Sequence, residues 1–358
     1  MKANLLFISS PGGVGFSESK TGKVHDDGTV AEDNYKALVK FFEKFPNLKN
    51  NEFYITGESY AGIYIPYLTY KIVQANKLPE TEMKINLKGI MINNACTDPR
   101  ECWEPGNDIN MGIYQYENLF HHGYYTEDEY LQITGACTMG YHSDACREVR
   151  QIMDAKFYRT NSSMLNLYAK CLYQKVDNPS NKTHVRLPHG KTKLMESELI
   201  CEDMYGINKY FNEGTVQTNL HVDIKKFEPC SDEVGDNYVM FENASYWLYP
   251  ILMKEKVRIW ITEGDVDNSV PITGTMTWLV RLRDEFGVKL LDQWREWWVP
   301  GLHKHEDQVG GMVWKLDGLM FASVKGAGHM VPKDKRKEAK VLLDSFLAGA
   351  DLPSNPNL

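Results

Sequence analysis

Short apolar runs alternate with amphipathic stretches along this chain, and that alternation predicts a sheet whose strands are joined by helices. In the stretch 33–45 the large apolar side chains recur every three to four residues, so it predicts a helix with one buried face, which Pro46 ends. A second helix is predicted at 63–73. Buried strands are predicted for the apolar runs at 4–8, 51–56, 85–92, 257–262 and 319–324. The pattern therefore indicates an α/β fold with a mostly parallel sheet.

Residues 57–62 read Gly-Glu-Ser-Tyr-Ala-Gly and lie between a predicted strand and a predicted helix. A serine on such a sharp turn is a nucleophile elbow, because the strained backbone holds the hydroxyl of Ser59 out of the sheet. Side chains larger than a methyl group at Gly57 or Ala61 would collide with neighbouring chain. Serines between small residues also occur in ordinary turns, so this motif alone is compatible with a turn that has no catalytic role.

Two further strand ends supply the groups that a serine nucleophile needs. The run 257–262 leads into Glu-Gly-Asp-Val-Asp, with carboxylates at Asp265 and Asp267, and the run 319–324 leads into a loop that presents His329. Taken singly, an aspartate at a strand end is equally typical of a turn, and the histidine is equally typical of an ordinary loop. In the chain order serine, aspartate, histidine they match the catalytic triad of α/β-hydrolases.

The residues that carry these groups resemble the serine carboxypeptidase family, which includes carboxypeptidase Y and cathepsin A. The matching blocks are 5–17, 57–62, 264–267 and 326–332. The resemblance implies an α/β-hydrolase fold, in which a mostly parallel central sheet is flanked by helices. It also implies release of C-terminal residues from peptide or protein substrates at acidic pH, without a cofactor.

The same resemblance assigns roles to individual residues. It makes Ser59 the nucleophile, Asp267 rather than Asp265 the orienting carboxylate, and His329 the general base and acid. The backbone N–H of Tyr60 becomes an oxyanion donor. Met330 lines the pocket for the leaving residue, or simply packs under its loop.

Glu58 resembles the family glutamate that binds the free carboxylate of the substrate as one of two paired carboxylic acids. Two carboxyl groups can lie beside a substrate carboxylate only if at least one is protonated, which is why an acidic working pH is expected. The plain alternative is that Glu58 caps the helix after the elbow.

The regular alternation stops between 97 and 246, where the chain becomes polar, irregular and cysteine-bearing. We predict that 1–96 and 247–358 form the two parts of the hydrolase core, and that 97–246 is a largely helical insertion over the active site. The polar tract 177–193 is a candidate cleavage site, or plain surface disorder.

The front of the chain departs from the family pattern. Family members begin upstream, with strands that include a Trp-Asn-Gly-Gly-Pro-Gly-Cys-Ser-Ser segment, and that segment supplies the second oxyanion donor, carboxylate-binding groups and the partner of Glu58. From its absence we expect a fragment, an incomplete gene model or a processed portion, in which the strands at 4–8 and 51–56 face an empty slot in the sheet.

Composition narrows the class of protein. The 358 residues, 42% of them hydrophobic, are enough for one large core with an insertion, and a net charge of −8 argues against nucleic acid as a partner. No run approaches the length of a membrane span, and the first residues do not form a signal peptide. The sequence leaves the oligomeric state open.

Cysteines and glycosylation patterns indicate the compartment. Seven dispersed cysteines without a Cys-x-x-Cys pair favour disulfides in an oxidising environment, and a free buried thiol is the less favoured alternative for Cys230. By resemblance, Cys230 pairs with the front of the chain. The acceptor patterns at Asn161, Asn181 and Asn243 add modest support for a lysosomal, vacuolar or secreted protein.

Other readings of the chain remain. The cluster at 303–307 resembles a metal site only weakly, and we predict no metal there. A carboxypeptidase-like acyltransferase would use the same acyl-enzyme with an alcohol or amine acceptor. A noncatalytic relative would lack activity, and a lipase-like esterase would cleave acyl esters without needing a free carboxylate.

Overall fold

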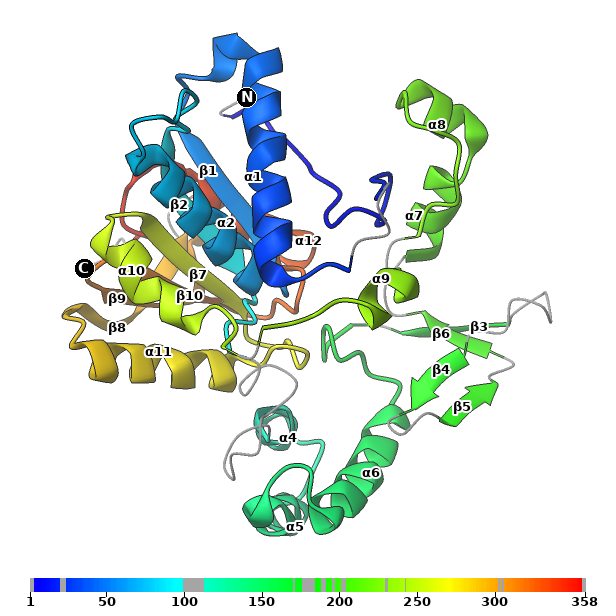
Figure 1. Ribbon diagram of the computed structural model, residues 1–358. Helices are drawn as coiled ribbons and strands as arrows, with labels where there is room; N and C mark the ends of the chain where they lie inside the picture. Colours follow the sequence, from blue (N-terminus) through cyan, green and yellow to red (C-terminus); the bar gives the residue numbers. More distant parts are fainter. Residues whose placement is uncertain are drawn as a thin grey trace. The chain divides into compact units, whose positions relative to one another are not determined.

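The computed structural model describes most of the chain (Figure 1). The described residues are 3–19, 24–98, 113–169, 171–175, 184–187, 191–194, 197–200, 204–228, 231–241, 243–301, 303 and 306–355. They form two compact units. The first comprises Met1–Phe53, Pro66–Leu87 and Glu202–Ala244, and the second comprises Tyr54–Ile65, Lys88–Cys201 and Ser245–Leu358.

Helices and strands alternate in the parts of the chain where the hydrophobic pattern predicts them. The α-helices are α1 (Asp27–Lys44), α2 (Ala61–Lys77), α4 (Tyr114–His121), α5 (Glu127–Ala136), α6 (Asp144–Tyr158), α7 (Met204–Phe211), α8 (Gly214–Asn219), α9 (Asp232–Asp236), α10 (Tyr249–Lys254), α11 (Ile272–Phe286), α12 (Val331–Asp334) and α13 (Arg336–Ala348). Short 3₁₀ helices occur at Pro46–Leu48, Cys137–Met139 and Tyr246–Leu248. The strands are β1 (Phe53–Glu58), β2 (Leu87–Asn93), β3 (Leu172–Lys175), β4 (His184–Leu187), β5 (Lys191–Leu194), β6 (Ser197–Ile200), β7 (Arg258–Gly264), β8 (Leu290–Val299), β9 (Gln308–Leu316) and β10 (Leu319–Val324).

A six-stranded sheet in the order β1-β2-β7-β10-β9-β8 organises the second unit. Strand β7 pairs in parallel with both β2 and β10, and β9 and β8 complete the sheet by antiparallel pairing. Because β7 and β10 run in the same direction and in register, their carboxyl ends meet at one edge of the sheet. That edge is where parallel sheets place their functional groups.

The central strands are buried because apolar side chains occupy both faces of the sheet. In the sheet register Met91, Trp260 and Met320 form one row across three strands. Phe346 of α13 packs its ring against Trp260 and against Tyr54, so α13 covers this face. Six buried residues in a row on β10 show that the strand has no solvent-facing side.

Helix α1 in the first unit begins at Asp27, earlier than the predicted start at residue 33. Asp26 explains the difference, because its Oδ1 atom accepts from the N–H of Thr29 at 2.7 Å while the Thr29 hydroxyl accepts from the N–H of Asp26 at 3.0 Å. This reciprocal capping box nucleates the helix upstream of its first apolar face.

The predicted strand at 4–8 is wrong. The segment has no strand partner among the described residues, and its apolar side chains are exposed, with 77% of Leu5 and 87% of Phe7 accessible. A strand forms only where a neighbouring backbone receives its hydrogen bonds, which a hydrophobic run does not guarantee. Strand β1, at the expected place near 51–56, stands first in the sheet order, with β2 as its neighbour.

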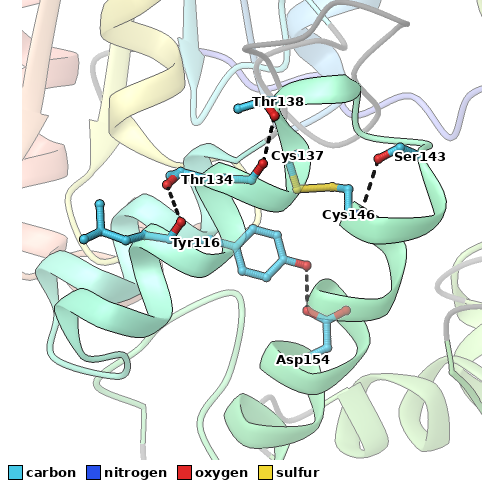
Figure 2. Close-up of a disulfide and its surroundings, with 9 residues drawn as sticks. Tyr116, Thr134, Cys137, Thr138, Ser143, Cys146 and Asp154 are labelled. Carbon is cyan, nitrogen blue, oxygen red and sulfur yellow. Dashed lines mark hydrogen bonds between the residues drawn. A yellow bond between two sulfur atoms is a disulfide. The ribbon is translucent and has the colours of Figure 1, made fainter.

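Residues 113–167 of the second unit include three α-helices and a disulfide. Helices α5 and α6 are tied by the bond between Cys137 and Cys146, while the hydroxyl of Tyr116 on α4 donates to Asp154 on α6 at 2.8 Å (Figure 2). The disulfide confirms the prediction of disulfide bonding from the cysteine pattern. The described part of 97–246 thus holds helices, together with two short two-stranded sheets, β3-β6 and β4-β5.

Candidate active site

Ser59 occupies a strained turn between β1 and α2. Its φ angle is +63°, a left-handed conformation that costs a serine free energy and that occurs at nucleophile elbows. A Cβ atom on Gly57 would lie 2.6 Å from the Cβ of Ala61, and one on Gly62 would lie 2.2 Å from the carbonyl oxygen of Cys96. The turn therefore requires glycine at positions 57 and 62, so at Gly57 even a methyl group is too large, while the size limit at Ala61 stays a prediction.

Three backbone hydrogen bonds hold Ser59 in that conformation. Its N–H donates to the carbonyl oxygen of Asn93 at 3.0 Å, at the end of β2. Its own carbonyl oxygen accepts from the N–H groups of Gly62 at 2.9 Å and Cys96 at 3.1 Å. The surrounding chain thus offsets the strain and leaves the half-buried side chain of Ser59 at the carboxyl edge of the sheet.

His329 and Asp267 come together although 62 residues separate them. The Nδ1 atom of His329 lies 2.7 Å from the Oδ2 atom of Asp267, whose side chain is fully buried. The carboxylate also accepts from the N–H groups of Ser269 at 2.8 Å and Val270 at 3.3 Å. These bonds orient the carboxylate, and the carboxylate in turn fixes which ring nitrogen of His329 faces away from it.

The loop that carries His329 is anchored at several points. The N–H of His329 donates to the carbonyl oxygen of Leu165 at 2.7 Å. Asp265 accepts from the N–H of Gly326 at 2.6 Å, and Asp334 accepts from the N–H of Gly328 at 2.8 Å. Asp265 therefore contacts the loop while Asp267 contacts the imidazole. The role of Asp267 rather than Asp265 as the orienting carboxylate stays a prediction.

The electrostatic environment favours the protonated form of His329. Burial by itself disfavours a charged imidazole, but the hydrogen bond and the negative charge of Asp267, together with the charge of Glu58, outweigh it and raise the pKa of His329 above its usual value. A histidine tuned upward in this way is a strong base once it is neutral.

Glu58 lies within electrostatic reach of the same pair. Burial raises the pKa of its carboxyl group, the positive charge of His329 opposes that rise, and the negative charges of Asp267 and Asp334 add to it. Glu58 consequently keeps its proton to a higher pH than an exposed glutamate.

The remaining predicted site residues lie in the following places. Tyr60 follows the elbow, and its carbonyl oxygen accepts from the N–H of Ile63 at 2.8 Å; Met330 is half-buried beside His329. Asn161 is half-buried and Asn243 is exposed, whereas Asn181 and Cys230 lie outside the described residues.

Across the part of the chain that the structure describes, no group of three His, Cys, Asp or Glu side chains is arranged to hold a metal ion.

Sequence reasoning missed the polar side chains that surround Asp267. Asn94 donates from Nδ2 to Oδ2 of Asp267 at 2.8 Å, and Asn118 of α4 donates to the backbone carbonyl of Asp267 at 3.0 Å. Glu263, one residue before the end of β7, is fully buried nearby. The one available signal was that Asn94 follows a predicted strand, at the edge where parallel strands end.

Comparison with known proteins gives a consistent result. A family model described as serine carboxypeptidase matches residues 1–349. Among curated sequences, serine carboxypeptidase-like 33 of Arabidopsis thaliana is 31% identical over 99% of this chain and 73% of its own length. Serine carboxypeptidase 24 of the same plant is 33% identical over 98% of this chain and 73% of its own length.

A solved structure supports the fold. The prohormone-processing carboxypeptidase Kex1(delta)p from Saccharomyces cerevisiae aligns with a TM-score of 0.71, at 22% sequence identity, over 98% of this chain and 75% of the yeast chain. Together with the mostly parallel sheet and its flanking helices, this similarity confirms the predicted α/β-hydrolase fold. In the described residues no helix has the length and apolar character needed to cross a membrane.

Proposed function

The chain belongs to the serine carboxypeptidase family of hydrolases, and we propose that it releases C-terminal residues from peptides through an acyl-enzyme on Ser59. The observation that carries the proposal is the 2.7 Å contact between Nδ1 of His329 and Oδ2 of Asp267. That pair lies at the carboxyl ends of β7 and β10, in the sheet whose strand β1 leads into the Ser59 elbow.

The proposed reaction has two steps. His329 takes the proton of the Ser59 hydroxyl as the oxygen attacks the last peptide carbonyl, and then gives that proton to the leaving amino group as the C–N bond breaks. Water next attacks the acyl-enzyme with His329 again as base, and the proton returns to Ser59. Asp267 keeps the imidazole oriented and stabilises its charge, and the N–H of Tyr60 donates to the developing oxyanion.

Glu58 supports selection of a free C-terminal carboxylate. A protonated Glu58 donates a hydrogen bond to that carboxylate, whereas an ionised Glu58 repels it. The raised pKa of Glu58 extends the protonated range and accounts for the acidic working pH that we propose. Met330, beside His329, is proposed to line the pocket of the leaving residue.

The disulfide between Cys137 and Cys146 supports an oxidising compartment, because cytosolic thiols are kept reduced. We place the protein in a lysosome, a vacuole or the secreted fraction on that ground. Asn161, Asn181 and Asn243 are its proposed glycosylation acceptors, and loss of a mass shift after enzymatic deglycosylation of each Asn→Gln variant tests them.

Fluorophosphonate labelling at mildly acidic pH tests the nucleophile, with mass spectrometry to locate the adduct and Ser59→Ala as control. We expect the adduct on Ser59 alone. Hydrolysis of one peptide with a free C-terminus and of the same peptide amidated then tests the carboxypeptidase assignment.

The free peptide should lose its last residue and the amidated one should react far more slowly. Equal rates on both peptides, or transfer of the acyl group to an added alcohol in preference to water, contradict the assignment. A folded chain without any adduct contradicts the role of Ser59 itself.

A further inference from the structure

A buried glutamate without a role in the proposed mechanism lies beside the aspartate–histidine pair. Glu263 on β7 is fully inaccessible to solvent. Its Oε1 atom lies 3.3 Å from Nδ2 of Asn94, and its Oε2 atom has no hydrogen-bond partner among the described residues. Burying an incompletely paired carboxyl group lowers the stability of the fold. A glutamate at this position therefore needs an explanation, such as a role in function.

Asn94 connects this glutamate to the pair. Its amide nitrogen has two hydrogens, and their acceptors are Oδ2 of Asp267 at 2.8 Å and Oε1 of Glu263 at 3.3 Å. Its amide oxygen accepts from the N–H of Gly264 at 3.2 Å. The amide nitrogen of Asn94 faces two acceptors and its oxygen faces a donor, so only one of the two flipped orientations of the amide satisfies all three hydrogen bonds.

The backbone of Asn94 is held equally firmly. Its φ angle is +44°, in the left-handed region, and its N–H donates to the carbonyl oxygen of Thr262 at 2.7 Å. The side chain therefore projects from a fixed point between the ends of β2 and β7. The rotation of its amide group is then set by the N–H of Gly264 together with the side-chain acceptors on Asp267 and Glu263.

We propose that Glu263 is a positioning residue, whose carboxyl oxygen locks the amide of Asn94 in the orientation that donates to Asp267 and so steadies His329. The proposal rests on the function proposed above. Glu263 itself contacts no substrate in this scheme and acts through Asn94.

The protonation state of Glu263 follows from its surroundings. Burial and the negative charge of Asp267 raise its pKa well above the usual value, while the hydroxyl of Thr275 on α11 and the amide of Asn94 oppose the rise. Ser323 is its register neighbour on β10. A protonated Glu263 still offers a carbonyl oxygen to Asn94, and it adds no second charge beside Asp267.

Two substitutions separate this role from mere packing. Glu263→Gln keeps a carbonyl oxygen at the same place, whereas Glu263→Met keeps the volume and removes the acceptor. We expect Glu263→Gln to retain kcat within about threefold and Glu263→Met to lose about tenfold in kcat with KM unchanged, as for loss of one hydrogen bond. Thermal melting checks that both fold, and Glu263→Val, suited to a strand, replaces Glu263→Met if that variant does not.

Nuclear magnetic resonance of the His329 ring supplies a readout that needs no turnover. The signal of the Nδ1 proton is assigned by its loss in His329→Gln and is followed against pH. In Glu263→Gln we expect the signal and the His329 pKa to match the wild type, and in Glu263→Met we expect the signal to broaden by faster exchange with water.

Each outcome decides the proposal. Wild-type kcat and an unchanged Nδ1 signal in Glu263→Met overturn it, as does a lowered His329 pKa in Glu263→Gln, because Glu263 would then act on His329 through its charge and not through Asn94. If the wild type cleaves no peptide, the proposed function fails while the resonance comparison still decides whether Glu263 positions the pair.

Discussion

A Cβ atom on Gly264 would lie 2.2 Å from the carbonyl oxygen of Gly328, so the end of β7 meets the loop of His329 backbone to backbone. Gly328 is equally confined, since its own Cβ would lie 2.3 Å from the carbonyl oxygen of Leu165. This contact sets how closely Asp267 and His329 can approach, because each follows one of the two glycines within a few residues. Glycine here serves close approach of backbones.

Replacing Gly264 by alanine should therefore destabilise the protein. We expect Gly264→Ala to lower the free energy of unfolding by roughly 2–4 kcal/mol, because the added Cβ would meet backbone atoms of Ala327 and Gly328, which cannot move aside as a flexible side chain can. Gly135 in α5 is the matched control: nothing lies within 4 Å of its added Cβ. Gly135→Ala should raise stability by about 0.5–1 kcal/mol. Urea unfolding of the two variants measures both values, and equal stabilities would show that the β7 contact is not tight.

The two aspartates after β7 provide a matched pair for the mechanism. Asp267→Asn should lower kcat by on the order of 10³–10⁴, because an asparagine cannot orient the imidazole and stabilise its charge. Asp265→Asn keeps an oxygen for the N–H of Gly326 and should stay within about threefold of the wild type. Steady-state peptide hydrolysis measures both, and comparable losses would mean that Asp267 only supports the loop.

The pH dependence of KM should report Glu58. Its pKa is raised mainly by burial, so it is protonated at acidic pH and ionises as the pH rises through that value. For a peptide with a free carboxylate, KM should therefore rise with pH in the wild type. In Glu58→Gln, KM should stay nearly flat because the amide remains a neutral donor. An amidated peptide, without a terminal charge, is the control, and a rise in KM for it too would assign the effect to another group.

The decrease of kcat at acidic pH should reflect the pKa of His329. The base must be neutral to take a proton, so kcat falls as the pH drops through the His329 pKa, which Asp267 raises. Protonation of His329 therefore lowers kcat at low pH, and ionisation of Glu58 raises KM as the pH increases. Full pH profiles of kcat and KM, measured separately, give the pH at which each change occurs.

Loss of the disulfide between Cys137 and Cys146 should cost stability without touching the chemistry. The bond closes a loop with a sequence separation of 9, for which constraint of the unfolded chain predicts roughly 2–3 kcal/mol. The double substitution Cys137→Ala with Cys146→Ala should lower the melting temperature and leave kcat unchanged. An unchanged melting temperature would show that helix packing alone holds α5 and α6 together.

The sequence by itself predicted the features that depend on residues close together in the chain. The elbow at Ser59 was visible because small residues must flank a strained serine, and both His329 and Asp267 were visible as polar residues just after apolar runs. Four of the predicted strands appear in the sheet near their expected places for the same reason, since burial of a strand requires an apolar run.

The tertiary structure decided whatever depends on partners distant in the chain. Residues 4–8 have the composition of a strand but no neighbouring backbone among the described residues, and their apolar side chains remain exposed. Asn94 and Glu263 gained their significance only when parallel pairing in register placed β2 beside β7. Local pattern determines which segments can become strands and turns, whereas hydrogen-bond pairing across the sheet determines which polar side chains meet at its edge.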